Sequence, residues 1–203
     1  MTGPIGAVNN GAEFLGDEGF DMQHEAVQLI LSSAHEAVNR LQFYRQAYGR
    51  VSDSGEACLA DKKQLAINFF EGSKVKLDWP DTHTDAAGIS ISQKTARLIL
   101  NMFVIAAAAM IRGGTISVRI GTNAAGDKIV TLSGKGETIK LDPETALILK
   151  GQGDDSMLSP KSAQPFLTRK IAEEVGATLA VEAHSDLFEI VATQHQLAVA
   201  AAS

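Results

Sequence analysis

Cysteine is almost absent from this sequence, since Cys58 is the only one among 203 residues. A single thiol cannot form an internal disulfide, and it cannot supply a zinc site that needs several cysteines. We therefore expect a fold that depends on its apolar core alone. The near absence of cysteine also favours a reducing compartment, and we predict a cytoplasmic location.

Basic charge and long apolar runs are scarce as well. The 18 Lys and Arg residues are outnumbered by 24 Asp and Glu residues, and the net charge of −6 argues against a nucleic-acid partner. The longest apolar stretch, 96–111, contains Arg97 and Asn101 and is shorter than the ~20 residues that span a bilayer. Residues 1–6 carry no basic side chain, unlike the start of a signal peptide. We therefore expect no membrane association, and the apolar stretch predicts a buried helix.

The apolar residues that are present form two blocks. Hydrophobic residues make up 45% and charged residues 21% of the chain, as in folded globular proteins. Before position 50 the pattern is helical, whereas after it helices alternate with short β-like runs. We predict two domains, 1–50 and 51–203, with the polar, turn-rich segment Gly49–Gly55 as a linker.

The first block predicts a helical hairpin. Apolar residues recur at steps of three and four from Pro4 to Leu15, and a longer stripe runs from about Asp21 to Tyr48 without glycine or proline. The segment 16–19 between them contains two glycines and breaks the pattern. A lone hairpin cannot bury the apolar stripes of both helices. We therefore expect a homodimer in which two hairpins form a four-helix bundle.

The second block predicts an α+β fold, with helices on one face of a mainly antiparallel sheet. The Asp- and Thr-rich segment 80–88 is an expected loop. Its Asp81, His83 and Asp85 alternate like metal ligands, but no further ligand cluster supports them, so a polar loop is the preferred interpretation. The expected elements are helix 61–70, strand 74–79, helix 92–112, strands 115–120 and 128–132, helices 143–149 and 160–175, and strands 178–182 and 187–193.

A helical hairpin followed by an α/β sandwich is the order of elements in a sensor histidine kinase core. The opening residues Met1-Thr2-Gly3-Pro4-Ile5 resemble the end of a kinase H-box, so the phosphoacceptor histidine and its acidic neighbour would fall just before Met1. The local alternative is that Pro4 simply begins a helix, with Thr2 or Gly3 as its cap.

Three nucleotide-binding motifs of such a kinase each lack their characteristic residues in this sequence. The segment Leu98–Ala106 resembles an N-box, but Ile105 stands in place of the Mg²⁺-binding Asn. In the run Leu132–Gly136, Leu132 stands in place of the Asp that recognises adenine. Ala163–Leu167 has no glycine where a G2 box would wrap the phosphates. These losses argue against ATP binding.

A kinase-like hairpin joined to an ATPase-like domain without its nucleotide motifs resembles the ChpT family of bacterial histidine phosphotransferases. The most specific matches are Gly3–Gly11 and Ser33–Arg45; beyond residue 50 the match is one of architecture. The resemblance implies a homodimer that relays phosphoryl groups from the receiver domain of a hybrid histidine kinase to those of response regulators. It implies no cofactor and no ATP-dependent kinase activity, because the receiver brings its own Mg²⁺ and aspartate site.

By position, the resemblance also implies a receiver-docking face on the two helices around the histidine. Small Gly3 and Gly6 would let a receiver helix approach closely, and arginines offer charge-assisted contacts. No residue of this sequence is predicted to be catalytic. The predicted receiver-docking residues are Thr2, Gly3, Asn9, Asn10, Arg40, Phe43 and Arg45.

Other interpretations remain open at this point. His35-Glu36 imitates the His–acid pair of an H-box, although a solvated helical histidine is the ordinary case. An active kinase would need ATP, against which the missing motifs argue. A dimeric module that binds receivers without accepting phosphate fits a sequence in which no histidine stands at the expected position.

Overall fold

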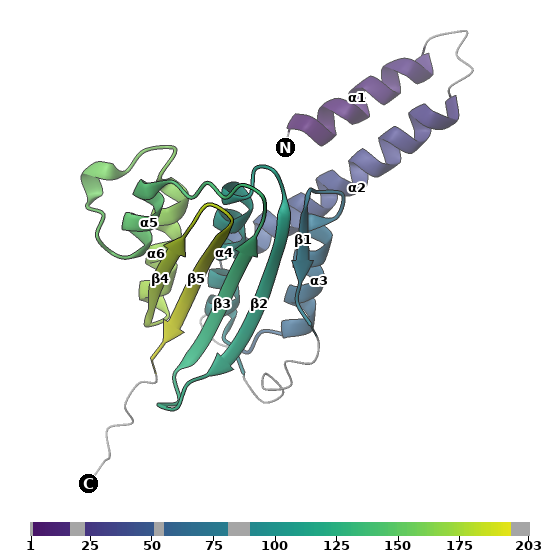
Figure 1. Cartoon of the computed structure of the whole chain (residues 1–203). Helices are drawn as coiled ribbons and strands as arrows, with labels where there is room; N and C mark the ends of the chain where they lie inside the picture. The colour runs from purple at the N-terminus through teal and green to yellow at the C-terminus, as the bar shows by residue number, and fades with distance from the viewer. Residues whose placement is uncertain (1, 17–22, 51–54, 81–89, 196–203) are drawn as a thin grey trace.

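The computed structural model describes residues 2–16, 23–50, 55–80 and 90–195. Most of the predicted linker 49–55 and of the loop 80–88, including Asp81, His83 and Asp85, lies outside these residues. Figure 1 shows a helical hairpin that projects from a sheet backed by helices. Its elements are α1 (Thr2–Gly16), α2 (Gln23–Tyr48), α3 (Leu59–Phe70), β1 (Val75–Asp78), α4 (Gln93–Ala109), β2 (Gly114–Thr122), β3 (Lys128–Lys135), α5 (Pro143–Leu149), the 3₁₀ turn Asp155–Met157, α6 (Ala163–Glu174), β4 (Ala177–Ala183) and β5 (Leu187–Gln194).

Helices α1 and α2 form the predicted hairpin and pack closely near its tip. Gly11 is buried where the two helices meet. A Cβ atom at this position would lie 2.7 Å from Ile30 Cγ1 and 3.1 Å from the Ala26 carbonyl oxygen. Glycine at position 11 therefore sets how closely the helices approach.

The C-terminal end of α2 leaves the hairpin and enters the core of the second domain. The Phe43 ring stacks on Phe69 of α3 with ring centroids 3.9 Å apart, and Tyr44 meets Phe69 edge-on. Phe43 and Ala47 are completely buried. The last two turns of α2 thus belong to the same core as α3 and α4, although they precede position 50.

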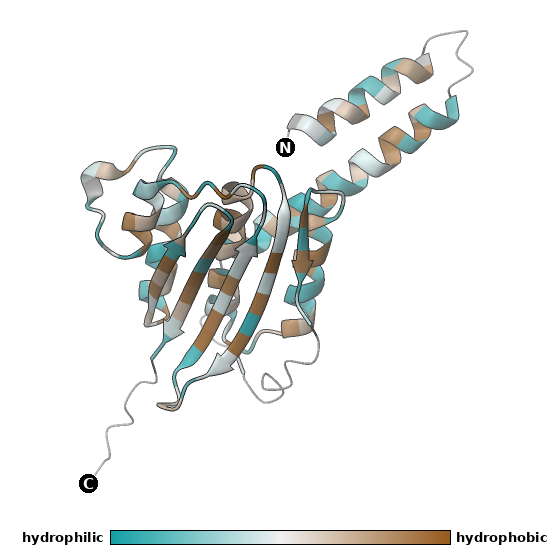
Figure 2. Cartoon of the chain, viewed as in Figure 1, coloured by the Kyte–Doolittle hydropathy of each residue, from teal (hydrophilic) through white to brown (hydrophobic). Residues whose placement is uncertain are grey.

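The sheet is mainly antiparallel, as predicted. Its strand order is β1-β2-β3-β5-β4, and only β1 and β2 run parallel. Along β2, Ile116, Val118 and Ile120 are buried, while the residues between them face away from the helices. This alternation, visible in Figure 2, explains why one face of the sheet carries the helices and the other faces solvent.

Helix α4 lies at the centre of the molecule and confirms the predicted buried helix, but it ends at Ala109 rather than Arg112. Met110 caps it through a hydrogen bond from its N–H to the Ala107 carbonyl oxygen. The chain then turns at Gly113, whose φ of 88° favours glycine, and enters β2 beside Lys74. Among the described residues, no helix has the length and apolar character to cross a membrane.

Candidate functional site

The predicted docking residues of α1 lie on an open surface of the hairpin. Thr2 is the first residue of α1, and Gly3, Asn9 and Asn10 are exposed. The Asn9 Nδ2 group donates a hydrogen bond to Glu13 Oε1 at 2.7 Å. No atom lies within 4 Å of where a Cβ would stand at Gly3 or Gly6, so the helix surface is accessible at both positions.

The predicted docking residues of α2 divide between surface and core. Arg40 pairs with Glu36 one turn earlier, at 2.6 Å, and Arg45 is exposed in the last turn of the helix. Phe43, in contrast, is fully buried against Phe69, so its assignment to the docking face is wrong. Phe43 lies between Arg40 and Arg45 in the sequence, but the helix directs its side chain toward Phe69 of α3.

The antiparallel hairpin brings the beginning of α1 beside the second half of α2, next to the sheet domain (Figure 1). Gly3 and Arg40 therefore lie at the same end of the hairpin. Asn9 and Asn10 lie farther toward its tip. The predicted docking residues therefore extend along the hairpin and do not form one compact cluster.

A polar contact missed by the sequence analysis joins the hairpin to α3. His35 Nε2 lies 3.5 Å from Glu71 Oε2, and Asn39 Nδ2 donates a hydrogen bond to the same oxygen at 3.3 Å. Asn39 is 5% exposed. A buried amide in an otherwise amphipathic helix signals such a partner, although the sequence cannot say that it is Glu71.

A second network joins the end of α2 to α4 and α6. Asn101 is completely buried, and its Nδ2 donates to the carbonyl oxygens of Ala47 and Arg97, both at 2.8 Å. Gln164 Nε2 donates to Asn101 Oδ1 at 3.0 Å, and Tyr48 donates its hydroxyl proton to Gln164 Oε1 at 2.8 Å. These contacts fix the hairpin relative to the sheet domain.

Core side chains occupy the positions that the sequence resemblance assigns to the nucleotide motifs of a kinase. Ile105 is 3% exposed and Leu132 is completely buried. Pro165, in the first turn of α6, is buried and has no N–H to offer a phosphate. Gly134 lies directly beneath the Phe188 ring, where a Cβ would come within 1.9 Å of Phe188 Cε1. This glycine therefore makes room for an aromatic ring and not for a phosphate.

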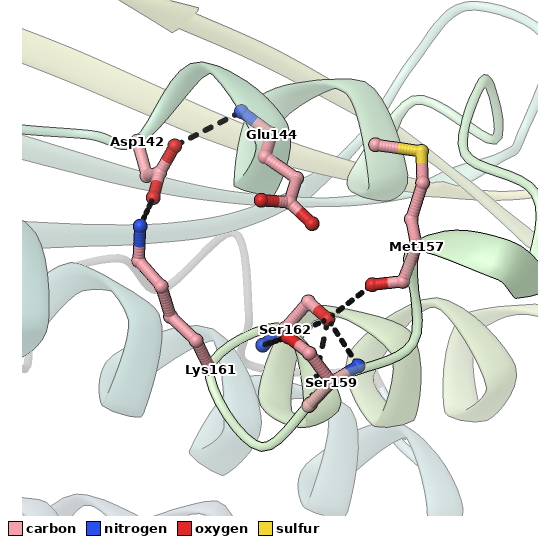
Figure 3. Close-up of polar contacts among 6 residues, drawn as sticks. All are labelled: Asp142, Glu144, Met157, Ser159, Lys161 and Ser162. Atoms are coloured by element: carbon pink, nitrogen blue, oxygen red, sulfur yellow. Dashed lines mark hydrogen bonds and ion pairs between the residues drawn. The ribbon is translucent and has the colours of Figure 1, made fainter.

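The segment before α6 is closed by its own hydrogen bonds (Figure 3). Ser162 donates its hydroxyl proton to the Met157 carbonyl oxygen at 2.6 Å and accepts from the Ser159 N–H at 2.9 Å. Nearby, Lys161 forms an ion pair with Asp142, the N-cap of α5. The hydrogen bond from Lys161, followed by that from the Glu144 N–H, lowers the pKa of Asp142, and the pairing raises the pKa of Lys161.

The described part of the chain contains no group of three or more His, Cys, Asp or Glu side chains placed to hold a metal ion. The features available for function are the open surface of the hairpin and its fixed junction with the sheet domain.

Comparisons with known proteins decide the family. Residues 59–186 match the family described as the histidine phosphotransferase C-terminal domain. The protein phosphotransferase ChpT of Brucella abortus (strain 2308) is 30% identical over 188 residues, which cover 92% of this chain and 86% of that protein. This chain belongs to the ChpT-type histidine phosphotransferases.

Solved structures agree with this membership. A bacterial phosphotransferase superposes with a TM-score of 0.75 and 29% identity, covering 93% of this chain and 87% of that chain. The histidine kinase domain of a blue-light-activated kinase from Erythrobacter litoralis superposes with a TM-score of 0.51 and 15% identity, covering 94% and 95%. The second match shows that this histidine phosphotransferase has the fold of a histidine kinase core.

Proposed function

We propose that this histidine phosphotransferase relays phosphoryl groups between receiver domains without using a nucleotide. The observation that carries this proposal is the burial of Ile105 and Leu132, which stand at the predicted metal-ligand and adenine-recognition positions. A side chain that is part of the apolar core cannot coordinate Mg²⁺ or bond to a base. The phosphoryl group must therefore come from a phosphorylated partner rather than from bound ATP.

The open end of the hairpin is the proposed docking surface for the receiver domain of a hybrid histidine kinase and for those of response regulators. Gly3 and Gly6 present no side chain, and Arg40 and Arg45 lie on α2. A receiver carries a negatively charged aspartyl phosphate, which the arginine guanidinium groups would attract. The receiver supplies the Mg²⁺ and aspartate chemistry, while the rigid hairpin holds the accepting imidazole in line with the phosphorus.

Helix α1 contains no histidine. By the H-box resemblance of residues 1–5, the accepting histidine and its acidic neighbour would fall just before Met1, which would put the imidazole at the open end of the hairpin. His35 does not stand at this position, because it lies on α2, where its Nε2 is 3.5 Å from Glu71 Oε2.

A homodimer completes this proposal. Exposed apolar residues separated by steps of four, seven and three follow one side of α2, as in the seam of a helical bundle. They are Val27, Leu31, Val38 and Leu41, and they are between 40% and 59% exposed. A second hairpin packed along this stripe would form a four-helix bundle and remove it from water.

The test is a transfer assay with a receiver domain phosphorylated with labelled phosphate. Two chains are compared: the printed sequence, and a variant with a His-Asp pair placed directly before Met1. We expect acid-labile, base-stable label on the extended variant, unchanged in a His35→Ala background. Label that depends on His35, or label taken directly from ATP, would contradict the proposed relay.

The absence of histidine from α1 favours a second candidate, a dimer that binds receivers without accepting phosphate. Both chains would then bind the receiver equally well, and neither would become labelled. Measuring receiver affinity and label in the same experiment separates the two candidates.

A further inference from the structure

A cavity of about 570 Å³ opens between α4, the start of α5 and the start of α6. This volume is in the range of small-molecule binding sites. The cavity shares Ile105 with the position where a kinase would bind its metal ion. Its lining residues are Val104, Ile105, Ala108, Ala109, Ile111, Lys140, Leu141, Asp142, Pro143, Thr145, Lys161, Gln164 and Pro165.

The wall of the cavity is apolar. Helix α4 contributes Val104 and Ala108, and Ile111 stands just beyond its end, with 68% of its surface exposed. Pro143 and Pro165 also line the cavity and offer no backbone N–H groups. Such a wall binds hydrocarbon better than it binds a polar ring or a triphosphate.

The rim of the cavity carries an available positive charge. Lys161 is paired with Asp142, as Figure 3 shows. Lys140 also lines the cavity, and within the described residues its ammonium group has no hydrogen bond or ion pair. Glu144 is not among the lining residues. The rim therefore offers one uncompensated cation at the edge of an apolar wall.

We propose that this cavity binds an amphipathic monoanion, with its hydrocarbon body against α4 and its carboxylate or equivalent head group at Lys140. The overall charge of −6 would repel anions elsewhere on the surface, so a local cation matters for recognition. The cavity also includes Gln164, which bonds to Tyr48 and Asn101. A bound ligand would therefore contact the network that fixes the hairpin.

The probe is decanoate, used below its micelle concentration, with decanol as its neutral counterpart. Calorimetry should show one decanoate per chain, with a dissociation constant on the order of 0.1 mM. Lys140→Glu should weaken decanoate binding about tenfold and leave decanol binding unchanged, because it reverses only the head-group charge. Lys150→Glu, at the end of α5 and outside the cavity lining, is the matched control and should bind decanoate nearly as wild type does.

A second measurement uses the unaltered chain. In NMR titrations, decanoate should shift the methyl signals of Ala108 and Ile111 and the side-chain amide signals of Gln164. Ala108→Trp should fill the cavity and abolish the shifts of Ile111 and Gln164. If this variant does not fold, the methyl shifts of the wild-type chain still decide.

Several outcomes would overturn the proposal. One is that decanoate does not bind at millimolar concentration, or that Lys140→Glu and Lys150→Glu weaken its binding equally. Another is ATP binding that depends on Lys140. The last is that the cavity stays empty in the decanoate titration while Ala108→Trp weakens receiver binding, which would make the cavity part of a protein interface.

Sedimentation with phosphatidylglycerol vesicles distinguishes a lipid source from a free anion. Sedimentation that depends on Lys140 would assign the head group to a membrane lipid.

Discussion

The Tyr48 hydroxyl donates a hydrogen bond to Gln164 Oε1 at 2.8 Å and so joins the last residue of α2 to the first turn of α6. Partial burial, and then the neighbouring Tyr44, raises the pKa of Tyr48, which keeps this hydroxyl protonated as a donor. Gln164 passes the connection on to the buried Asn101, which holds the Ala47 carbonyl oxygen. One chain of hydrogen bonds thus runs from the solvent-exposed end of the junction into the core.

We expect a substitution in this network to reduce the stability of the protein more at a buried position than at an exposed one. Asn101→Ala removes three hydrogen bonds, to Ala47, Arg97 and Gln164, from a completely buried position, so it should destabilise the protein by about 2 kcal/mol or more. Tyr48→Phe, at the exposed end, should cost about 1 kcal/mol or less. Urea unfolding of both variants measures the difference, and equal losses would contradict this gradient.

Gly134 and Gly121 provide a matched pair of substitutions in neighbouring strands. Gly134→Ala would push a methyl group into the Phe188 ring and should destabilise the fold by about 2 kcal/mol. Gly121→Ala meets nothing within 4 Å and should change stability by no more than about 0.5 kcal/mol. Thermal unfolding tests both. In the Phe188→Leu background Gly134→Ala should reduce stability by less than it does in the wild type. If the stability losses of the two substitutions were fully additive, the Phe188 ring would not be the cause of the Gly134→Ala effect.

Leu31 and Leu158 test the proposed dimer. Both are about equally exposed, at 59% and 61%, but only Leu31 lies on the apolar stripe of α2. Leu31→Glu should shift the sedimentation coefficient from that of a dimer to that of a monomer, because it places a charge in the bundle seam. Leu158→Glu should sediment like the wild type. A wild-type chain that is monomeric at all concentrations would exclude the bundle.

The contribution of Asp142 to stability should depend on pH. Its pKa is lowered in the folded protein, so its stabilising effect is present above its unfolded pKa of about 3.9 and is lost as the pH falls through the folded value. The raised pKa of Lys161 means that the pair also loses its contribution as the pH rises through that folded pKa.

Asp142→Ala removes the N-cap of α5 and should cost about 1 kcal/mol at pH 7. Asp142→Asn keeps a capping oxygen and should cost less. Urea unfolding at pH 7 and at pH 3 checks both, and a difference between wild type and Asp142→Asn that stays constant down to pH 3 would show that the carboxylate charge is unimportant.

The sequence predicted most elements of the fold because its apolar periodicity is clear. The boundaries of α2 and α5 follow directly from the stripe that ends at Tyr48 and from Asp142-Pro143 at the start of a short helix. The end of α4 was predicted too late, since the residues after Ala109 are apolar but are drawn into the turn beside Lys74. Tertiary contacts decide that boundary.

The candidate site was less predictable, because periodicity identifies an apolar residue without identifying what it packs against. Phe43 and Leu41 are both apolar residues of α2, yet Phe43 is buried against Phe69 and Leu41 is 49% exposed. Only the position of α3 distinguishes them. Asn101 gave a signal that could have been used, since an amide within an apolar helix predicts a buried hydrogen-bond partner.

The passage of α2 from the hairpin into the sheet domain also governs how the protein unfolds. Removing the hairpin at position 50 would take Phe43 and Ala47 away from Phe69 and Asn101, which would expose aromatic surface and remove one of the two acceptors of the Asn101 amide. The sheet domain and the base of the hairpin therefore form one cooperative unit, and the rest of the hairpin can open separately from it. Proteolysis would trim the hairpin from its tip and stop where α2 meets α3.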